Sequence, residues 1–206
     1  MKKIIMIAVL LAAGRLYAQD TTTGKSPFGK KIYHSGYGAL TTTYSKFNGD
    51  DAIFVGAYGG WMINHKLMLG LAGHYLVTQH DGYSFNPQTN KMNELKMGYG
   101  GLMVEYTFFE SKVVHATANT LVGFGVVTNG SQGNYNPATD ESWVSSDESG
   151  FLAFHPSINV EVSVTDWFRV SAGGGYRLIT SSDIASISNA DMSGLTANVT
   201  LKFGVF

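Results

Sequence analysis

The chain has 206 residues, of which 14% are charged and 13% are aromatic, and it contains 25 glycines and no cysteine. Soluble domains usually carry about 25% charged residues, so this composition argues against an ordinary soluble domain. The formal net charge of −1 gives no electrostatic reason to expect a nucleic acid partner. Without cysteine, neither disulfides nor a lipoprotein acylation site are expected.

The N-terminal residues have the pattern of a secretory signal. Two lysines are followed by the apolar run 4–14 and then by the small residue Ala18, which is the order found in cleavable signal peptides. The apolar run is too short to cross a bilayer of about 30 Å as a helix. We therefore expect a signal peptide at residues 1–18 and a short periplasmic segment at residues 19–30.

Eight later segments are predicted to be strands, and all but the first alternate between apolar and polar residues. Because side chains alternate across a strand, each alternating segment has one apolar and one polar face. The clearest is the last, in which every odd position from Leu195 to Val205 is apolar. The expected strands are residues 31–46, 51–63, 67–79, 94–108, 113–128, 150–164, 167–180 and 192–206.

The connections between these strands alternate in length. Short turns are expected at residues 64–66, 109–112 and 165–166. The other connections are a short one at residues 48–50 and longer polar segments at residues 80–93, 129–149 and 181–191. Outer-membrane barrels have short periplasmic turns and longer extracellular loops. The sequence therefore predicts an all-β fold: an eight-stranded antiparallel up-and-down transmembrane β-barrel at residues 31–206, monomeric, in a Gram-negative outer membrane, with both termini periplasmic.

Position parity assigns the two faces of each strand. Outward positions of the later strands are apolar and uncharged, as lipid contact requires. Aromatic residues such as Trp61, Phe108 and Trp167 fall near the periplasmic ends, where an aromatic girdle is expected. The first strand has no clear face, because the run Thr41 to Thr43 offers no contrast between polar and apolar positions.

The inward parity places charged side chains inside the barrel. An eight-stranded barrel has an interior just wide enough for side chains to fill, and unpaired buried charge is costly. We therefore expect a paired polar plug and no open pore, with Glu161 and Arg169 brought together by the turn between their strands. The predicted charge network consists of Glu105, Glu161, Arg169, Arg177 and Lys202.

Part of the predicted interior is apolar. Strands two to four send Phe54, Tyr58, Met68 and Met103 inward. The first interpretation is a packed mixed core in which methionine fills gaps. The alternative is a small apolar cavity for an acyl chain, which would make the protein a barrel that binds or transports a lipid or another small hydrophobic ligand.

The signal, the alternating strands, the loop phase and the terminal aromatic residue resemble those of small eight-stranded outer-membrane barrels, over essentially the whole mature chain. The stretch from Gly59 to Lys66 looks like barrels of the Bacteroidetes type, most of which have no assigned task. The resemblance implies contact with outer-membrane lipid, lipopolysaccharide and the outer-membrane assembly machinery. It also implies an assembly signal at Phe203 and Phe206, although Phe206 is out of phase with the apolar face of its strand.

One polar constellation on strand six invites an enzymatic interpretation. His155 and Ser157 form a His-x-Ser pair with Glu161 nearby, and outer-membrane lipid A deacylases are similar in carrying such a pair. In that family the pair faces the lipid, whereas parity points it inward here, away from any lipid ester. We therefore expect satisfied interior polar residues, no enzyme activity, and neither a cofactor nor a metal ion.

The connection at residues 129–149 is acidic, with Asp140, Glu141, Asp147 and Glu148 and no lysine or arginine. Its spacing matches no calcium loop, so a solvated acidic surface is expected. Tyr135 and Trp143 in the same connection suit contact with an extracellular ligand, protein or cell, because long loops on a rigid scaffold commonly carry function.

Overall fold

The computed structural model describes residues 24–25, 31–78, 81–86, 91–109, 113–136, 141–182 and 187–206. The expected signal peptide at residues 1–18, and most of the segment at residues 19–30, lie outside this part of the chain. None of the helical segments among the described residues is long and apolar enough to cross a membrane.

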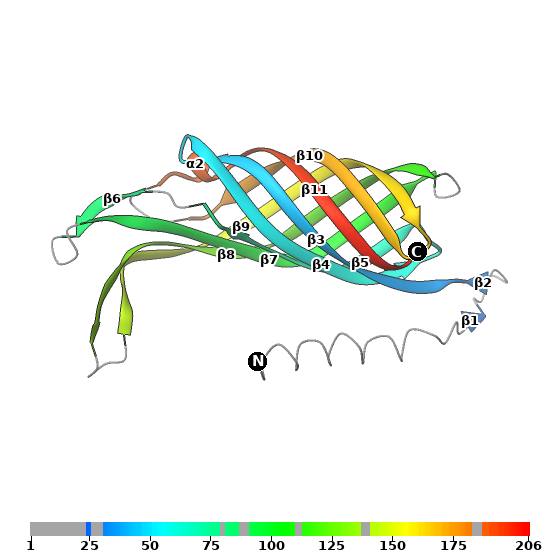
Figure 1. Ribbon diagram of the computed structural model, residues 1–206, viewed down its shortest axis with the longest axis horizontal. Coiled ribbons are helices and arrows are strands. Elements are labelled where there is room, and N and C mark those ends of the chain that lie inside the picture. Colours follow the sequence, from blue (N-terminus) through cyan, green and yellow to red (C-terminus); the bar gives the residue numbers. More distant parts are fainter. Residues whose placement is uncertain are drawn as a thin grey trace.

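Eight of the described strands form one closed antiparallel barrel (Figure 1). Each strand pairs with its neighbour in the chain, and the pairing of β11 with β3 closes the circle. The predicted fold class is therefore confirmed. The strands are β3 (His34–Phe47), β4 (Asp50–Ile63), β5 (Leu67–Leu76), β7 (Lys91–Phe108), β8 (Val114–Asn136), β9 (Glu141–Thr165), β10 (Phe168–Thr180) and β11 (Gly194–Val205).

The three longer polar connections, at residues 80–93, 129–149 and 181–191, contain regular structure, which corrects the prediction of plain loops. Two of them contain a separate short element, and in the third the neighbouring barrel strands are longer than predicted. A short strand, β6 (Asp81–Asn86), pairs with the beginning of β7. A short helix, α2 (Asn189–Met192), lies between β10 and β11 and begins with a capping box formed by Ser188 and Asp191. Elsewhere β1 (Gly24–Lys25) pairs with β2 (Lys31–Ile32).

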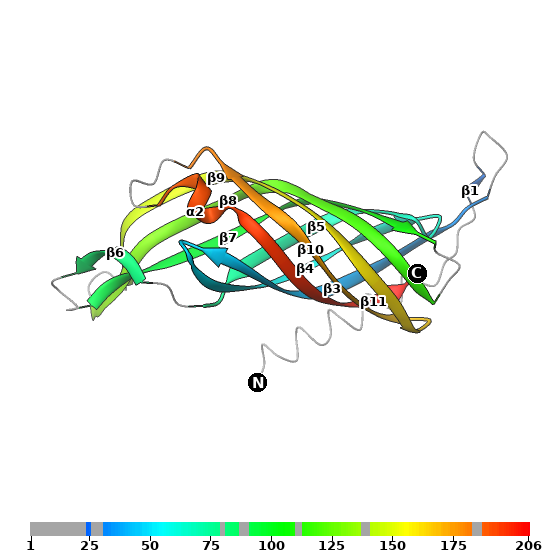
Figure 2. The same cartoon turned by 90° about the horizontal axis from the view of Figure 1, so that it is seen from above.

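The largest difference is the length of β8 and β9. β8 pairs with β7 only as far as Gly130, yet its pairing with β9 continues to Asn136 and Glu141. Figure 1 shows this two-stranded hairpin turning away from the barrel, and Figures 1 and 2 show that β6 and the beginning of β7 project at the same end. Beyond the barrel the two strands are held by hydrogen bonds to each other, and the backbone groups on their outer edges can bind water, so a polar segment forms strands there without an apolar face.

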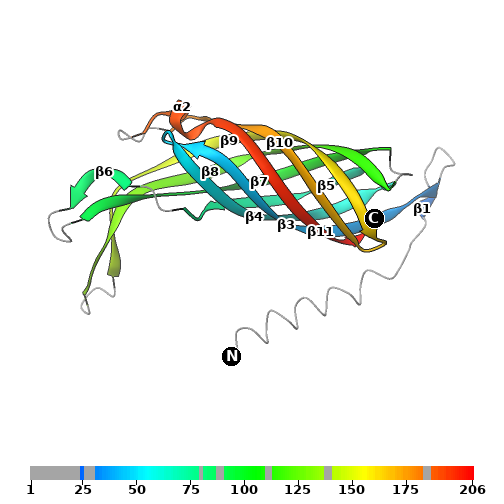
Figure 3. The same ribbon diagram turned by 45° about the horizontal axis from the view of Figure 1, so that its top comes forward.

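The two ends of the barrel differ. At one end, here called the turn end, lie the turns at residues 64–66 and 166–167 and the last residue, Phe206. The opposite end, here called the hairpin end, carries the turn at Asn48 and Gly49, the β8–β9 hairpin and α2 (Figure 3). Asn48 and Gly49 have φ angles of 55° and 86°, the left-handed region that two-residue hairpin turns of the primed types require. The short turns at residues 64–66 and 166–167 thus share one end, and the short connection at Asn48 and Gly49 lies at the other, as predicted.

The outer face of the barrel is apolar. Large hydrophobic side chains point away from every barrel strand, and the most exposed in mid-strand include Leu71, Leu102, Phe124 and Ile158, at 66–72%. The predicted outward parity agrees with this placement. The structure also shows the phase of the first strand, because Leu40 points outward whereas Ala39 and Thr41, on either side of it, point inward.

Inward glycines of neighbouring strands face each other in the barrel wall. Gly101 of β7 pairs with Gly123 of β8. A Cβ atom added to Gly123 would overlap the carbonyl oxygen of Gly100 in the neighbouring strand. Close backbone approach of this kind is a position where only glycine fits.

Candidate functional site in the barrel lumen

A cluster of paired charges occupies the half of the lumen nearer the turn end. Lys202 of β11 lies between two carboxylates, with its Nζ 2.5 Å from Oε1 of Glu105 and 2.5 Å from Oε2 of Glu161. All three side chains are 1% exposed. The three residues come from β11, β7 and β9, so the barrel closure itself brings them together.

Glu161 also binds the guanidinium of the adjacent strand. Arg169 of β10 donates a hydrogen bond from Nη1 to Oε1 of Glu161 at 3.0 Å. The tight turn between β9 and β10 places these residues side by side, as the sequence predicted. Two carboxylates are therefore matched by Lys202 and Arg169, which offsets the cost of burying charge. Nε2 of His115 lies 3.5 Å from Oε1 of the same carboxylate.

Neutral donors complete the surroundings of Glu105. The hydroxyl of Tyr37 donates to Oε1 at 2.6 Å, and Tyr58 and Asn119 each donate to Oε2 at 3.4 Å. Sequence reasoning missed Tyr37, because the threonine run left the phase of the first strand undecided. An inward Tyr37 follows once β3 is paired with β4 and β11.

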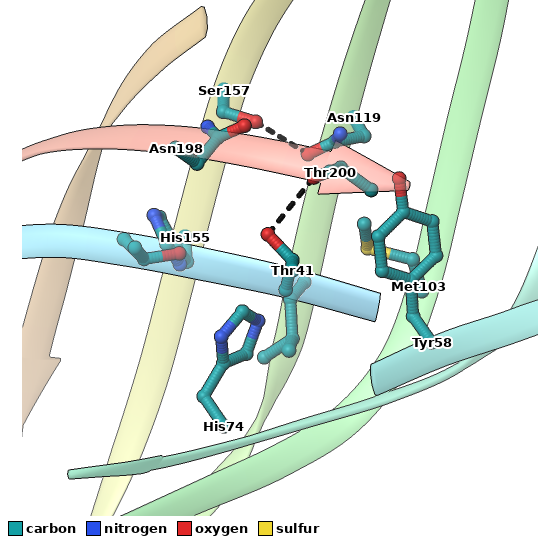
Figure 4. A pocket seen from close by; sticks show the side chains of 11 residues that line it. Thr41, Tyr58, His74, Met103, Asn119, His155, Ser157, Asn198 and Thr200 are labelled. Atoms are coloured by element: carbon teal, nitrogen blue, oxygen red, sulfur yellow. Dashed lines mark hydrogen bonds between the residues drawn. The ribbon is translucent and has the colours of Figure 1, made fainter. Parts of the chain in front are cut away.

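A small cavity of about 20 Å³ lies in the lumen, and its lining side chains are drawn in Figure 4. Tyr58 and Asn119, which donate to Glu105, are among them. A space of this size holds about one water molecule, whereas ligand pockets measure about 300–1,000 Å³. Its lining is mostly polar and consists of Thr41, Thr43, Tyr58, His74, Met103, Asn119, Leu121, His155, Ser157, Asn198 and Thr200.

The four residues proposed for an acyl-chain cavity do not line one common space among the described residues. Tyr58 and Met103 line the small polar cavity. Phe54 and Met68 are fully buried in the hydrophobic core of the lumen.

His155 and Ser157 do not form a nucleophile and base pair. Oγ of Ser157 donates to Oδ1 of Asn119 at 2.6 Å. The ring nitrogens of His155 are hydrogen-bonded to other groups, Nδ1 to the hydroxyl of Tyr99 at 3.2 Å and Nε2 to Thr196 at 3.0 Å. Glu161 lies in the charge cluster. Figure 4 shows Ser157 turned toward Asn119, so the arrangement lacks the contact by which a base activates a nucleophile.

Arg177 lies apart from the charge network in which the sequence placed it. Its side chain is fully buried at the hairpin end. It donates to the carbonyl oxygens of Met192 and Lys46 at 2.9 and 3.2 Å and to Oγ of Ser45 at 3.3 Å, and its guanidinium lies 4.2 Å from the ring centre of Phe54. These partners are neutral, so Arg177 ties α2 to the end of β3 and is not a counter-ion for either lumen carboxylate.

The hairpin end of the lumen is filled by apolar side chains. The buried residues there include Phe47, Leu76, Leu95, Met97, Val127, Phe151, Ile179 and Met192.

The two residues proposed as an assembly signal face opposite ways. Phe203 is exposed on the outer face and stacks on Phe168, with ring centres 5.0 Å apart. Phe206 packs against the lumen core instead. The out-of-phase position of Phe206 in the sequence therefore corresponds to an inward ring, and only Phe203 lies in phase with the apolar face.

The remaining sequence predictions concern a metal site and the acidic connection at residues 129–149. In the part of the chain that the structure describes, no group of three or more His, Cys, Asp or Glu residues is arranged to hold a metal ion. Asp147 is half-buried and Glu148 is exposed on the β8–β9 hairpin. Asp140 and the side chains of Tyr135, Glu141 and Trp143 lie outside the described part.

No protein family model matches the chain, and a comparison with curated proteins finds no match. Among solved structures, the chain is similar to Neisserial surface protein A, with 15% identity, a TM-score of 0.49, and coverage of 84% of this chain and 96% of that one. It is also similar to the N-terminal β-barrel domain of OprF from Pseudomonas aeruginosa, with 11% identity, a TM-score of 0.46, and coverage of 82% and 96%. Ail, the attachment invasion locus protein of Yersinia pestis, gives 12% identity, a TM-score of 0.41, and coverage of 83% and 97%. At these identities no activity or partner is carried over to this chain.

Proposed function

We propose that the protein is a monomeric outer-membrane barrel with a closed lumen, whose role is structural or lies in surface contacts made at the hairpin end. The observation that carries this proposal is the inversion of polarity across the barrel wall. Exposed large hydrophobic side chains cover the outside, while Glu105, Glu161 and Lys202 are buried inside. A closed sheet with an apolar exterior suits the lipid interior, because within the barrel wall each of the eight strands is paired on both sides.

The orientation follows from the unequal ends. Short turns face the periplasm in such barrels and longer connections face outward, so the turn end is periplasmic and the hairpin end is extracellular. The N-terminal pattern of an export signal supports delivery to this membrane. The stretch from Gly59 to Lys66 supports a barrel of the Bacteroidetes type. Outer-membrane lipid, lipopolysaccharide and the assembly machinery are the partners that this placement implies.

A closed lumen is supported by three layers. Apolar side chains fill the extracellular end, the cavity in the middle holds about one water, and the charge cluster lies below it. A porin needs a continuous aqueous path, whereas an eight-stranded barrel is just filled by its side chains. The contacts of His155 and Ser157 support a role in filling the lumen and no enzymatic role.

The β8–β9 hairpin is the part that we assign to surface contact. It continues beyond the last pairing of β7 with β8 at Gly130, so its two strands project past the barrel rim. Projection on a rigid scaffold is the setting in which loops carry recognition. A protein or ligand outside the cell is the expected partner at this hairpin.

Two measurements test the proposal. Fractionated cells should contain the protein in the outer membrane, and its migration on gels should change on heating, as expected for a folded barrel. Liposomes that contain the purified protein should swell in sugar solutions no faster than empty liposomes. Recovery as a soluble periplasmic protein without a heat-modifiable form would contradict the location, and rapid swelling that depends on sugar size would contradict the closed lumen.

A further inference from the structure

The ring of Phe206 turns into the lumen at the periplasmic mouth. Its neighbours on the strand, Phe203 and Val205, are exposed on the outer face at 40% and 53%. Phe206 follows the last residue of β11 and is partly buried against the lumen core. A large aromatic ring thus lies at the periplasmic entrance to the charge cluster, where lipid contact plays no part.

Two contacts hold this ring. The guanidinium of Arg169 lies 3.9 Å from the ring centre of Phe206, which is the distance of a cation–π interaction. The ring of Tyr37 lies 5.2 Å from it, at an interplanar angle of 34°, within the range of favourable aromatic pairs. Phe206 therefore contacts side chains from β10 and β3, the two strands that flank β11.

These contacts complete a closed circuit of side chains. Arg169 binds Glu161, Glu161 and Glu105 both bind Lys202, and Glu105 accepts a hydrogen bond from Tyr37. Phe206 joins the two ends of this series, since it touches both Arg169 and Tyr37. The circuit draws on β3, β7, β9, β10 and β11.

We propose that Phe206 is the periplasmic lid of the lumen and that it positions Arg169 on Glu161. This inference deepens the closed lumen described above and rests on it. With the ring in place, the guanidinium has a carboxylate on one side and an aromatic face on the other, and water has no direct approach to the buried cluster. Without the ring, Arg169 gains room to turn toward the periplasm and water reaches Glu161 and Lys202.

A single engineered thiol reports on this access. The chain has no cysteine, so Ser171→Cys supplies the only thiol. Ser171 is 2% exposed and pairs in register with Glu161 and Thr200, which places it at the level of the cluster. Its rate of modification by a small cationic thiosulfonate reagent is measured in folded protein reconstituted in liposomes. Phe206→Ala in this background should raise the rate by about tenfold, the size expected from losing one aromatic and one cation–π contact together.

Two variants provide controls. Phe203→Ala removes an aromatic residue of the same strand that faces outward, and it should leave the modification rate unchanged. Phe206→Tyr keeps the aromatic face and should keep the slow rate. Should Phe206→Ala fail to fold, as judged by heat-modifiable migration, Phe206→Leu retains apolar bulk without the aromatic face and should give an increase smaller than that expected for alanine.

The outcomes separate the lid from the closed lumen. Fast modification of Ser171→Cys with Phe206 intact, together with rapid liposome swelling, would overturn the closed lumen itself. A slow rate that stays equally slow in the folded Phe206→Ala or Phe206→Leu variant would overturn the lid and leave the closed lumen standing. An equal increase in Phe203→Ala would show general loosening of β11 and would also overturn the lid.

Discussion

Nζ of Lys202 lies 2.5 Å from Oε1 of Glu105, although 97 positions separate the two residues in the chain. The pair forms only because the barrel closes, since β7 and β11 are not neighbours in the sheet. Glu105 has no other cation within ion-pair distance among the described residues, whereas Glu161 also has Arg169. Lys202 is therefore the residue on which the charge balance of the cluster depends.

Replacing Lys202 with methionine should leave Glu105 as a buried carboxylate without a cation. Breaking a buried pair in this way typically costs about 3–5 kcal/mol of unfolding free energy. The double variant Lys202→Met/Glu105→Gln should recover a large part of that loss, because the uncompensated charge is then gone. Unfolding in urea, followed by tryptophan fluorescence in lipid vesicles, measures both effects.

A matched control lies on the exposed rim. Lys46 and Asp51 form an ion pair at 2.6 Å, with side chains 60% and 67% exposed. Exposed pairs contribute little because solvent screens them and their side chains lose freedom, so Lys46→Met should leave the unfolding midpoint unchanged. An equal shift in Lys202→Met and Lys46→Met would mean that the lumen pair is solvated.

The outer face and the number of barrel strands could be predicted because lipid imposes a strict alternation. Phe124 shows it plainly, since it is apolar and has a glycine on both sides. The first strand resisted prediction because Thr42 and its neighbours suit either face. The length of β8 and β9 also escaped prediction, because beyond the barrel no apolar face is needed and residues 129–149 look like any polar loop.

The sequence predicted which residues point into the lumen better than it predicted which of them contact one another. Parity identified Glu105, Glu161 and Lys202 as inward residues, and closure brought them together. Arg177 also points inward. Its partners depend on its position along the barrel axis, and the sequence does not show how far along that axis residues of β10 lie relative to residues of β7. For Phe206, the broken phase of the strand was itself the signal for an inward ring.

A lysine at the middle of the apolar face should be costly in lipid. Leu102 is 67% exposed near the middle of the barrel portion of β7, where a charge costs about 2–4 kcal/mol of folding free energy. Val113 is equally exposed, at 66%, but lies at the turn end just before β8, where the cost is about 0–1 kcal/mol. Unfolding of Leu102→Lys and Val113→Lys in vesicles should show this difference. Equal costs would contradict the depth assigned to the two positions.

Alanine at Gly123 should destabilise the barrel because its Cβ meets backbone atoms of β7 that have no room to move. Overpacking of this kind costs about 1–3 kcal/mol. Gly38 of β3 is the control, since a Cβ there meets nothing within 4 Å. The free energy of unfolding of Gly38→Ala should match that of the parent protein. A harmless Gly123→Ala would mean that the close approach of β7 and β8 is not required.

Removing the guanidinium of Arg177 should loosen α2 while leaving the barrel intact. Arg177→Met keeps the apolar stem but takes the donors from the carbonyl oxygens of Met192 and Lys46. The amide of Asn48, which donates to the carbonyl of Asp191 at 2.8 Å, should then exchange its hydrogen faster. Arg169→Met, at the opposite end of the lumen, should not change that rate. Exchange at Asn48 that is equally slow in both variants would show that α2 is held without Arg177.

Expression of the protein should leave the mass of lipid A unchanged, and Ser157→Ala should make no difference. Two observations support this expectation, the hydrogen bonds of Ser157 and His155 and their place inside the barrel. The hydroxyl of Ser157 donates a hydrogen bond to Oδ1 of Asn119 at 2.6 Å, and the ring nitrogens of His155 are hydrogen-bonded to Tyr99 and Thr196. The two residues also line a cavity that holds about one water, inside the barrel wall and away from the ester bonds of the outer leaflet. Mass spectrometry of lipid A from cells with and without the protein checks this directly. A loss of one acyl chain that disappears in Ser157→Ala would require Ser157 to reach the lipid face, and it would overturn the inward assignment of this part of β9.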